Sequence, residues 1–401
     1  MFHVEHQGFI FSPILLTFDP NFNTMAGIYL HIPYCKTRCP YCDFFTQTDH
    51  ASLDRYTEAL LREMELRKNY LDGEAIQTIY FGGGTPSRLS TEMLDKILRH
   101  IFDVYLVIDN PEITLECNPD DVDRDYLKKL GDTGINRLSL GTQSFSDQEL
   151  FFLGRRHDAS QNHSTLEQAL AAGFDNISID LIYGLPGSTN EQWQQNLDQA
   201  FAYPIKHLSA YHLTIEPDTP FGEKKEKGEL QELDEQTSLQ QFQMLIDHTR
   251  RHGMEHYELS NFALPGYRSR HNSSYWHRQR YLGLGPSAHS YNLTSRHQNI
   301  ASLKFYMDGV MEGTPHIEEE ILDQNSHFND YLITGLRTRE GIPLDEITRR
   351  FGDEYKDYLL KACRNFIDTG KLILDGHYLR LSDKGKFVSD SILRQLVWVE
   401  D

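Results

Sequence analysis

The sequence predicts an α/β fold in which an open, partial (β/α)6 barrel is followed by a small C-terminal winged-helix-like α+β module. Between residues 26 and 215, short β-rich runs alternate with helical stretches, a pattern typical of parallel strands joined by crossover helices. The six units fall short of the eight that close a barrel. Polar motifs follow the predicted strands, so we expect a functional site at their carboxyl ends.

The barrel elements are predicted from apolar runs and helical periodicity. We expect strands at residues 27–32, 76–81, 112–117, 135–140, 176–182 and 206–212. We expect helices between them at residues 51–69, 91–102, 122–133, 160–172 and 191–203.

The pattern changes after the sixth unit. Residues 222–235 are charged and predict a loop, 236–252 predict a helix, and 254–300 show little periodicity. The tail predicts helices at 329–337, 344–351 and 355–369, then a hairpin around Asp375 and Gly376 and a last helix after Ser382. We therefore divide the chain into an N-terminal extension (1–25), the barrel (26–235), an extension (236–324) and the C-terminal module (325–401).

Composition excludes several classes of function. The 401 residues carry a formal net charge of −20, which disfavours nucleic acid as a partner. No apolar run reaches the roughly 20 residues of a membrane-spanning helix, so we expect a cytoplasmic protein with no integral membrane segment. The first 24 residues lack the features of a signal peptide, and we expect the working chain to start at Met25.

Three of the five cysteines, Cys35, Cys39 and Cys42, form a C-x3-C-x2-C motif directly after the first predicted strand. Thiolates are soft ligands that suit iron–sulfur clusters or zinc. A structural zinc site needs four ligands, and the nearest further candidates, Asp43 and His50, do not repeat a zinc-finger spacing. Three thiolates on a [4Fe–4S] cluster would leave one iron open for a substrate.

The remaining two cysteines, Cys117 and Cys363, lie in a predicted strand and a predicted helix. Free cysteine usually behaves as a small buried hydrophobe, so neither is expected to be a ligand.

Each later strand also ends in residues that suit ligand binding. A run of glycines from Gly82 to Gly84 would let a ligand approach the backbone closely. Glu116 and Gln143 end the third and fourth strands, and Asp180 lies in the fifth. Taken singly, each of these residues is equally consistent with a turn, a cap or a salt bridge; their shared position on one rim favours a binding site.

The cysteine loop followed by the glycine run resembles the radical S-adenosylmethionine (SAM) superfamily. The resemblance implies a radical SAM barrel, a [4Fe–4S] cluster on the three cysteines and SAM chelated to the open iron. Within the superfamily, the chain most resembles one branch, and this resemblance covers about residues 26–390. The branch contains the oxygen-independent coproporphyrinogen III oxidases and the HemW-type heme chaperones. Matching positions imply these SAM contacts, with Tyr211 as a further candidate: Tyr29, Tyr41, Gly83, Gly84, Thr85, Glu116, Gln143, Arg155 and Asp180.

Two features separate the branches. The oxidases carry a further cysteine two residues after the third cluster ligand, where this chain has Phe44. His271, Tyr275 and Trp276 match the H-N-x-x-Y-W motif of the chaperones, which is associated with heme binding. An imidazole is a ready axial ligand for heme iron, and the two aromatic rings offer flat apolar surface.

The residues around this motif add to the same interpretation. The neighbouring arginines at 268, 270, 278 and 280 can pair with heme propionates. His256 and His277 are competing candidates for the iron ligand, and His271 as a purely structural histidine stays an alternative.

The sequence thus favours a heme chaperone that binds heme and transfers it to an acceptor apoprotein. The alternative is an oxidase that decarboxylates coproporphyrinogen III to protoporphyrinogen IX, so whether the chain is an enzyme stays open and no catalytic residue is assigned. Either function implies an electron donor for the cluster, and homodimer formation stays open as well.

Overall fold

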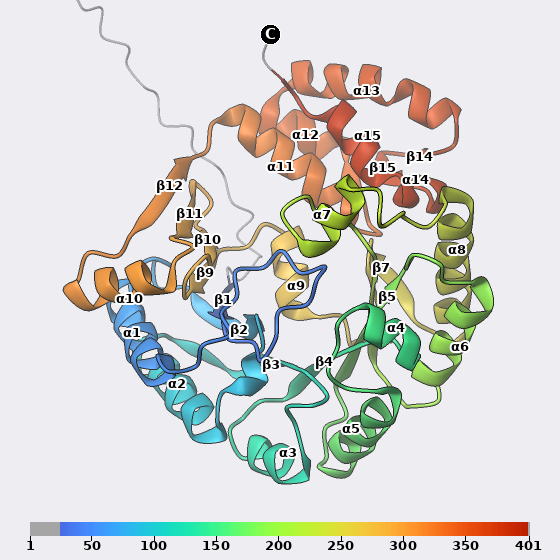
Figure 1. The fold of residues 1–401 in the computed structure, drawn as a ribbon. Coiled ribbons are helices and arrows are strands. Elements are labelled where there is room, and N and C mark those ends of the chain that lie inside the picture. Colours follow the sequence, from blue (N-terminus) through green and yellow to red (C-terminus); the bar gives the residue numbers. More distant parts are fainter. Residues whose placement is uncertain (1–24, 400–401) are drawn as a thin grey trace, which may run out of the picture.

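The computed structural model describes residues 25–399, which form a large sheet of twelve strands and a small sheet of three. The strand order across the large sheet is β12-β11-β10-β9-β1-β2-β3-β4-β5-β6-β8-β7. Figure 1 shows helices around the outside of this curved sheet and the C-terminal helices grouped at one end of the molecule. The sequence predicts that the working chain starts at Met25. Residues 1–24, on which this prediction bears, lie outside the described residues.

Six parallel strands form the centre of the large sheet, which confirms the predicted β/α units. Their carboxyl ends lie within three residues of the predicted ends, because buried apolar runs mark such strands clearly in a sequence. Their bounds are β1 Met25–Ile32, β2 Ala75–Gly83, β3 Val107–Cys117, β4 Arg137–Gln143, β5 Ile177–Tyr183 and β6 His207–His212.

Helices connect these strands, and two more helices follow the last strand. They are α1 Leu53–Leu66, η1 Pro86–Arg88, α2 Thr91–Val104, α3 Arg124–Gly131, α4 Asp147–Phe152, α5 Ala159–Ala171, α6 Asn190–Ala200, α7 Pro220–Glu226 and α8 Glu235–Arg251. The predicted loop at 222–235 is wrong for its first residues, which belong to α7. Thr219 caps this short helix and Pro220 opens it, a start signal that the charged composition hides. Among the described residues, none of the helices is long and apolar enough to cross a membrane.

Residues 254–300 hold more regular structure than their weak periodicity indicates. The segment contains β7 Glu255–Glu258, β8 Asn261–Ala263, α9 Arg270–Trp276, β9 Tyr281–Leu284, β10 His289–Tyr291 and β11 Ser295–Asn299. These strands are three to five residues long, too short to show a period. They form because the existing sheet offers edges: β8 pairs with β6, and β9 pairs in parallel with β1.

The C-terminal residues build a separate cluster of buried apolar side chains, centred on Phe328, Leu359 and Leu379. The predicted hairpin is confirmed, with β14 antiparallel to β15 and Gly376 at a positive φ of 60° in the turn. The remaining elements are α10 Leu303–Glu312, β12 Ile317–Ile321, α11 Gln324–Arg337, β13 Ile342–Pro343, α12 Leu344–Phe351, α13 Asp353–Asp368, β14 Leu372–Asp375, β15 Tyr378–Leu381, α14 Asp383–Phe387 and α15 Ser389–Leu396.

A buried ion pair at the end of α1 holds the segment from β9 to β11 against that helix. Glu63 is fully buried, and its carboxylate accepts hydrogen bonds from the backbone N–H of Gly285 (2.9 Å), from Asn299 Nδ2 (2.7 Å) and from the hydroxyl of Tyr306 (2.7 Å). Arg67, one turn later, lies 3.3 Å from Glu63. Polar atoms surround both charges, which is the condition for keeping an ion pair inside a protein.

Replacing Glu63 by Ala leaves Arg67 buried without its counter-charge. We expect Glu63→Ala to lower the free energy of unfolding by about 3–5 kcal/mol. The measurement is chemical unfolding followed by circular dichroism. The matched control is Glu65→Ala on the same helix, whose exposed pair with His100 is expected to contribute below about 1 kcal/mol. Equal effects of both substitutions would contradict the role of the buried Glu63–Arg67 pair in stability.

Candidate functional site

The three cysteines lie on a loop that leaves the carboxyl end of β1 and returns to α1. The backbone N–H of Cys35 donates to the carbonyl of Gln47 (2.8 Å), and that of Cys42 donates to the carbonyl of Cys39 (3.2 Å). Cys35 is buried, and Cys39 and Cys42 are half-buried. These contacts fold the loop back on itself, so that residues close in sequence also stay close in space.

Hydrogen-bond donors from other strands reach two of the sulfur atoms. Thr85 Oγ1, after β2, lies 3.3 Å from Cys35 Sγ, and Arg155 Nη1 lies 3.6 Å from Cys39 Sγ. Gly84 leaves room beside the loop, because a Cβ there would come within 3.1 Å of Cys35 Sγ. Donors directed at sulfur stabilise thiolates, the form in which cysteine binds metal.

Burial disfavours the charged form of two of these thiols in the absence of metal. It raises the pKa of the Cys42 thiol to about 11 and also raises the pKa of Cys35. Across residues 25–399, no group of three or more His, Cys, Asp or Glu side chains is arranged around one metal ion. A cubane places each thiolate on a different iron, so its ligands do not meet at a single point.

A chain of hydrogen bonds links the cysteine loop to the ends of β3 and β4. Arg155 Nη2 donates to Asn118 Oδ1 (2.5 Å) and to the carbonyl of Gly141 (3.0 Å), and Asn118 Nδ2 donates to Thr85 Oγ1 (3.1 Å). The Nε of Arg155 is buried and finds no acceptor among the described residues. A buried guanidinium with one unsatisfied N–H suits a site that takes a carboxylate ligand.

Two carboxylates stand further along the same rim. Tyr80 donates its hydroxyl to Glu116 Oε1 (2.8 Å), and Ser139 donates to Asp180 (3.1 Å). Burial raises the pKa of Glu116 to about 7, and it also raises the pKa of Asp180. Both groups can therefore accept hydrogen bonds from a neutral polar ligand, but ionising them here costs more than in water.

Backbone conformation supports this rim at two positions. Gly83 has φ of 105°, and a Cβ there would lie 2.6 Å from the His31 ring. Gln143 adopts a φ of 62° at the end of β4, a conformation that non-glycine residues rarely take. The structure thus brings most of the predicted SAM residues to one edge. Tyr41 lies there beside Arg155 and Cys39 and also packs against Phe221.

The predicted heme motif forms helix α9, which lies against the sheet beside β2. The Glu112 carboxylate accepts the backbone N–H groups of Arg270 and His271, each at 3.0 Å, at the start of this helix. The His271 ring is buried, with Thr78 Oγ1 2.8 Å from Nδ1 and the Tyr275 hydroxyl 2.8 Å from Nε2. Its pKa is lowered to about 3, chiefly by burial.

His271 is therefore not an open ligand in this structure, because both of its ring nitrogens already have partners. Its assignment as heme ligand stays a prediction, and coordination through Nε2 would require Tyr275 to move away. The competing His256 is also closed, since its Nε2 lies 3.1 Å from the Leu259 carbonyl. His277 ends α9 on the surface.

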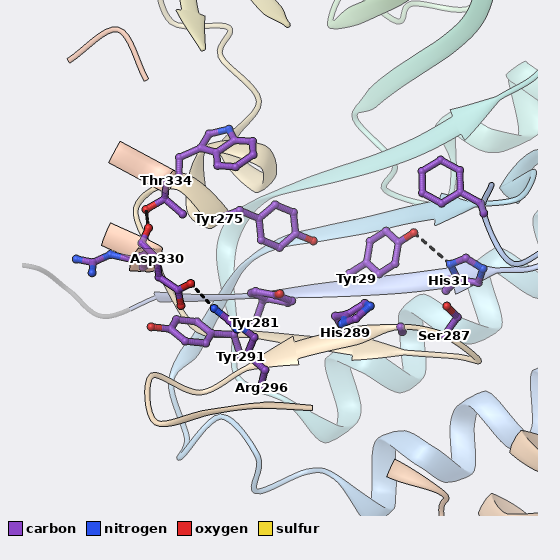
Figure 2. A pocket seen from close by; sticks show the side chains of 14 residues that line it. Tyr29, His31, Tyr275, Tyr281, Ser287, His289, Tyr291, Arg296, Asp330 and Thr334 are labelled. Atoms are coloured by element: carbon purple, nitrogen blue, oxygen red, sulfur yellow. Dashed lines mark hydrogen bonds and ion pairs between the residues drawn. The ribbon is translucent and has the colours of Figure 1, made fainter. Parts of the chain in front are cut away.

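Tyr275 and Trp276 line a cavity of about 560 Å³, a size that suits a small-molecule ligand (Figure 2). The cavity lies between the cysteine loop, the barrel rim, the β9–β11 strands and α11. Its aromatic lining is Tyr29, Phe44, Tyr275, Trp276, Tyr281 and Tyr291.

Most of the arginines flanking the motif are not placed to pair with heme propionates, the role expected of them. Arg268 pairs with Glu255 and Glu340, Arg280 pairs with Asp72 and Glu74, and Arg270 donates to a backbone carbonyl. Of the predicted set, only Arg278 lines the cavity. Two further cavity residues, His289 and Arg296, were missed by sequence reasoning, and no local motif marks them.

Comparison with known proteins agrees with this geometry. Residues 29–200 match the family model of the radical SAM superfamily, and residues 322–388 match that of the HemN C-terminal domain. The chain is 31% identical to heme chaperone HemW of Lactococcus lactis (92% of this chain, 96% of the relative) and 32% identical to that of Bacillus subtilis (92% and 98%).

A solved structure shows the same fold. The coproporphyrinogen III oxidase HemN of Escherichia coli superposes with a TM-score of 0.81 at 23% identity, over 94% of this chain and 91% of that one. With relatives above 30% identity along nearly their whole length, the chain belongs to the HemW heme chaperone family within the radical SAM superfamily.

Proposed function

We propose that this protein is a heme chaperone, which holds heme in the aromatic cavity and passes it to an acceptor protein. The observation that carries the proposal is the cavity itself: aromatic rings, two arginines and two histidines line one space that borders the cysteine loop. Flat apolar surface suits a porphyrin face, and a guanidinium suits a propionate. The names of the relatives support the same occupant.

The cysteine loop is proposed to hold a [4Fe–4S] cluster through Cys35, Cys39 and Cys42. The donors on two sulfurs and the space left by Gly84 fit such a group. When bound, the cluster supplies one electron at a time and an open iron for SAM. Thiolate ligands must stay reduced, so a reducing compartment such as the cytoplasm suits this site.

SAM is proposed to bind along the rim next to the loop, as an exchangeable ligand. The free Nε of Arg155 would meet the methionine carboxylate, and the backbone around Gly83 would approach the methionine amine. Glu116 would accept the ribose hydroxyls, with Tyr80 holding that carboxylate in place. Tyr29 lies beside Gly82 at the boundary between this rim and the cavity.

One experiment separates a chaperone from the alternative oxidase. Reconstituted protein is mixed, without oxygen, with coproporphyrinogen III, SAM and a reductant, and in parallel with hemin followed by a heme-free acceptor protein. We expect stable hemin binding, loss of hemin to the acceptor and no protoporphyrinogen IX. Formation of protoporphyrinogen IX with turnover of SAM would replace the chaperone by the oxidase.

The cluster assignment is tested by removing single thiols. We expect reconstituted protein to contain about four iron atoms and four sulfide ions per chain. Cys35→Ala, Cys39→Ala and Cys42→Ala should each lose most of this iron, because a cubane held by two thiolates dissociates readily. The control is Cys117→Ala, a buried cysteine on β3. Zinc in place of iron and sulfide would refute the cluster.

The raised pKa of Glu116, about 7, predicts a pH effect on SAM binding. The ionised carboxylate accepts hydroxyl hydrogen bonds best, and protonation removes that charge, so affinity should fall as the pH drops. Between about pH 8 and about pH 6 we expect a loss of up to tenfold, measured by equilibrium dialysis of labelled SAM. Glu116→Gln should bind more weakly at the upper pH and lose most of the dependence; an unchanged profile would remove Glu116 from the role.

A further inference from the structure

We propose that His289, rather than His271, coordinates heme iron in the cavity. This inference rests on the proposed function, because it concerns how heme would be held. It assigns the axial ligand to a residue of strand β10, which lies outside the H-N-x-x-Y-W motif. Three observations carry it: the closed state of His271, the open state of His289, and the placement of charge around the cavity.

The motif histidine acts as a support for the cavity wall. His271 is buried against β1 and β2, stacked on the Tyr80 ring with centroids 4.9 Å apart, and it does not line the cavity. Its Nε2 contacts the hydroxyl of Tyr275, and Tyr275 does line the cavity. The ring therefore positions Tyr275, and an iron atom in the cavity would meet the tyrosine before the imidazole.

His289, unlike His271, is open to the cavity. Its side chain is exposed and lines the cavity, and no residue in the described part of the chain hydrogen-bonds to its ring nitrogens. Figure 2 shows His289 together with Tyr29 and Tyr281 among the side chains that line this cavity. Desolvation by the cavity walls and the nearby charge of Arg296 lower the pKa of His289, which keeps the imidazole neutral at pH 7, the form that ligates metal.

The backbone that carries His289 is held from several sides. Its own carbonyl packs against Gly283 of β9, where a Cβ would come within 2.0 Å of that oxygen. The next residue, Ser290, accepts the backbone N–H of Gly283 at 2.9 Å and a hydrogen bond from Arg67 at 3.0 Å. A ligand on a braced strand holds its iron more precisely than one on a loop.

Charge around the cavity fits an anionic macrocycle. Arg278 lines the cavity with its guanidinium 4.4 Å from the centre of the Tyr331 ring, and no carboxylate forms an ion pair with it among the described residues. By contrast, Arg296 is already paired with Glu320 and Asp330. Arg278 is therefore the cation left to pair with a propionate when His289 binds the iron.

The test compares hemin with iron-free protoporphyrin IX, which has the same ring and propionates but no metal. Hemin is titrated into the full-length protein and followed by the Soret absorbance, and protoporphyrin IX by its fluorescence. We expect His289→Gly to lose the histidine-ligated hemin spectrum and to bind hemin about tenfold or more weakly. Its affinity for protoporphyrin IX should change by less than about twofold, because the cavity walls remain.

Added imidazole should restore the ligated spectrum in His289→Gly, a rescue that a merely structural role would not show. His277→Ala is the matched control, since His277 is an exposed histidine directly after α9 that does not line the cavity. His271→Gln, which keeps a polar side chain beside Tyr275, should retain the ligated spectrum.

A wild-type hemin spectrum in His289→Gly, or loss of that spectrum only in His271→Gln, would overturn the assignment while leaving heme binding in place. Failure of the unaltered protein to bind hemin at all would instead overturn the proposed function, and the ligand assignment with it.

Discussion

The parallel pairing of β9 with β1 is the constraint on which the cavity depends. It joins residues 27–30 to residues 281–284, so a segment near the middle of the sheet meets one from more than 250 positions later in the chain. Gly27 on the same strand lets α9 pack closely on the sheet, because a Cβ there would meet Thr78 at 2.8 Å and the His271 ring at 3.3 Å. Without that pairing, the cysteine loop and the β9–β11 strands would not border one space.

The same strand β1 borders both of the proposed sites. Its carboxyl end leads into the cysteine loop, whereas Tyr29 and His31 on the strand itself line the cavity. Parallel strands bring their carboxyl ends to one edge, which is why ligands gather there in α/β proteins. The proposed SAM rim and the proposed heme cavity are therefore neighbours, because strand β1 contributes to both.

Local charge works against the acidic character of the whole chain. The protein carries a net charge of −20, yet the cavity presents Arg278 without an ion-pair partner in the described residues. Of the other arginines near the motif, Arg268 and Arg280 form ion pairs with carboxylates that include Glu340 and Glu74, far from them in sequence, and Arg270 donates to a backbone carbonyl. Tertiary contacts thus decide which of several similar cations stays available to a ligand.

The sequence by itself determined the six parallel strands, the position of the cysteine loop and most of the rim, because apolar runs, glycines and cysteine spacing are local signals. It also marked α9 through its motif. Only the tertiary structure decided that His271 is enclosed and that His289 faces the cavity. The physical reason is that burial and hydrogen bonding of an imidazole depend on partners such as Thr78, which is 193 positions away. The short strands of residues 254–300 likewise form through pairing with distant edges rather than through any period of their own.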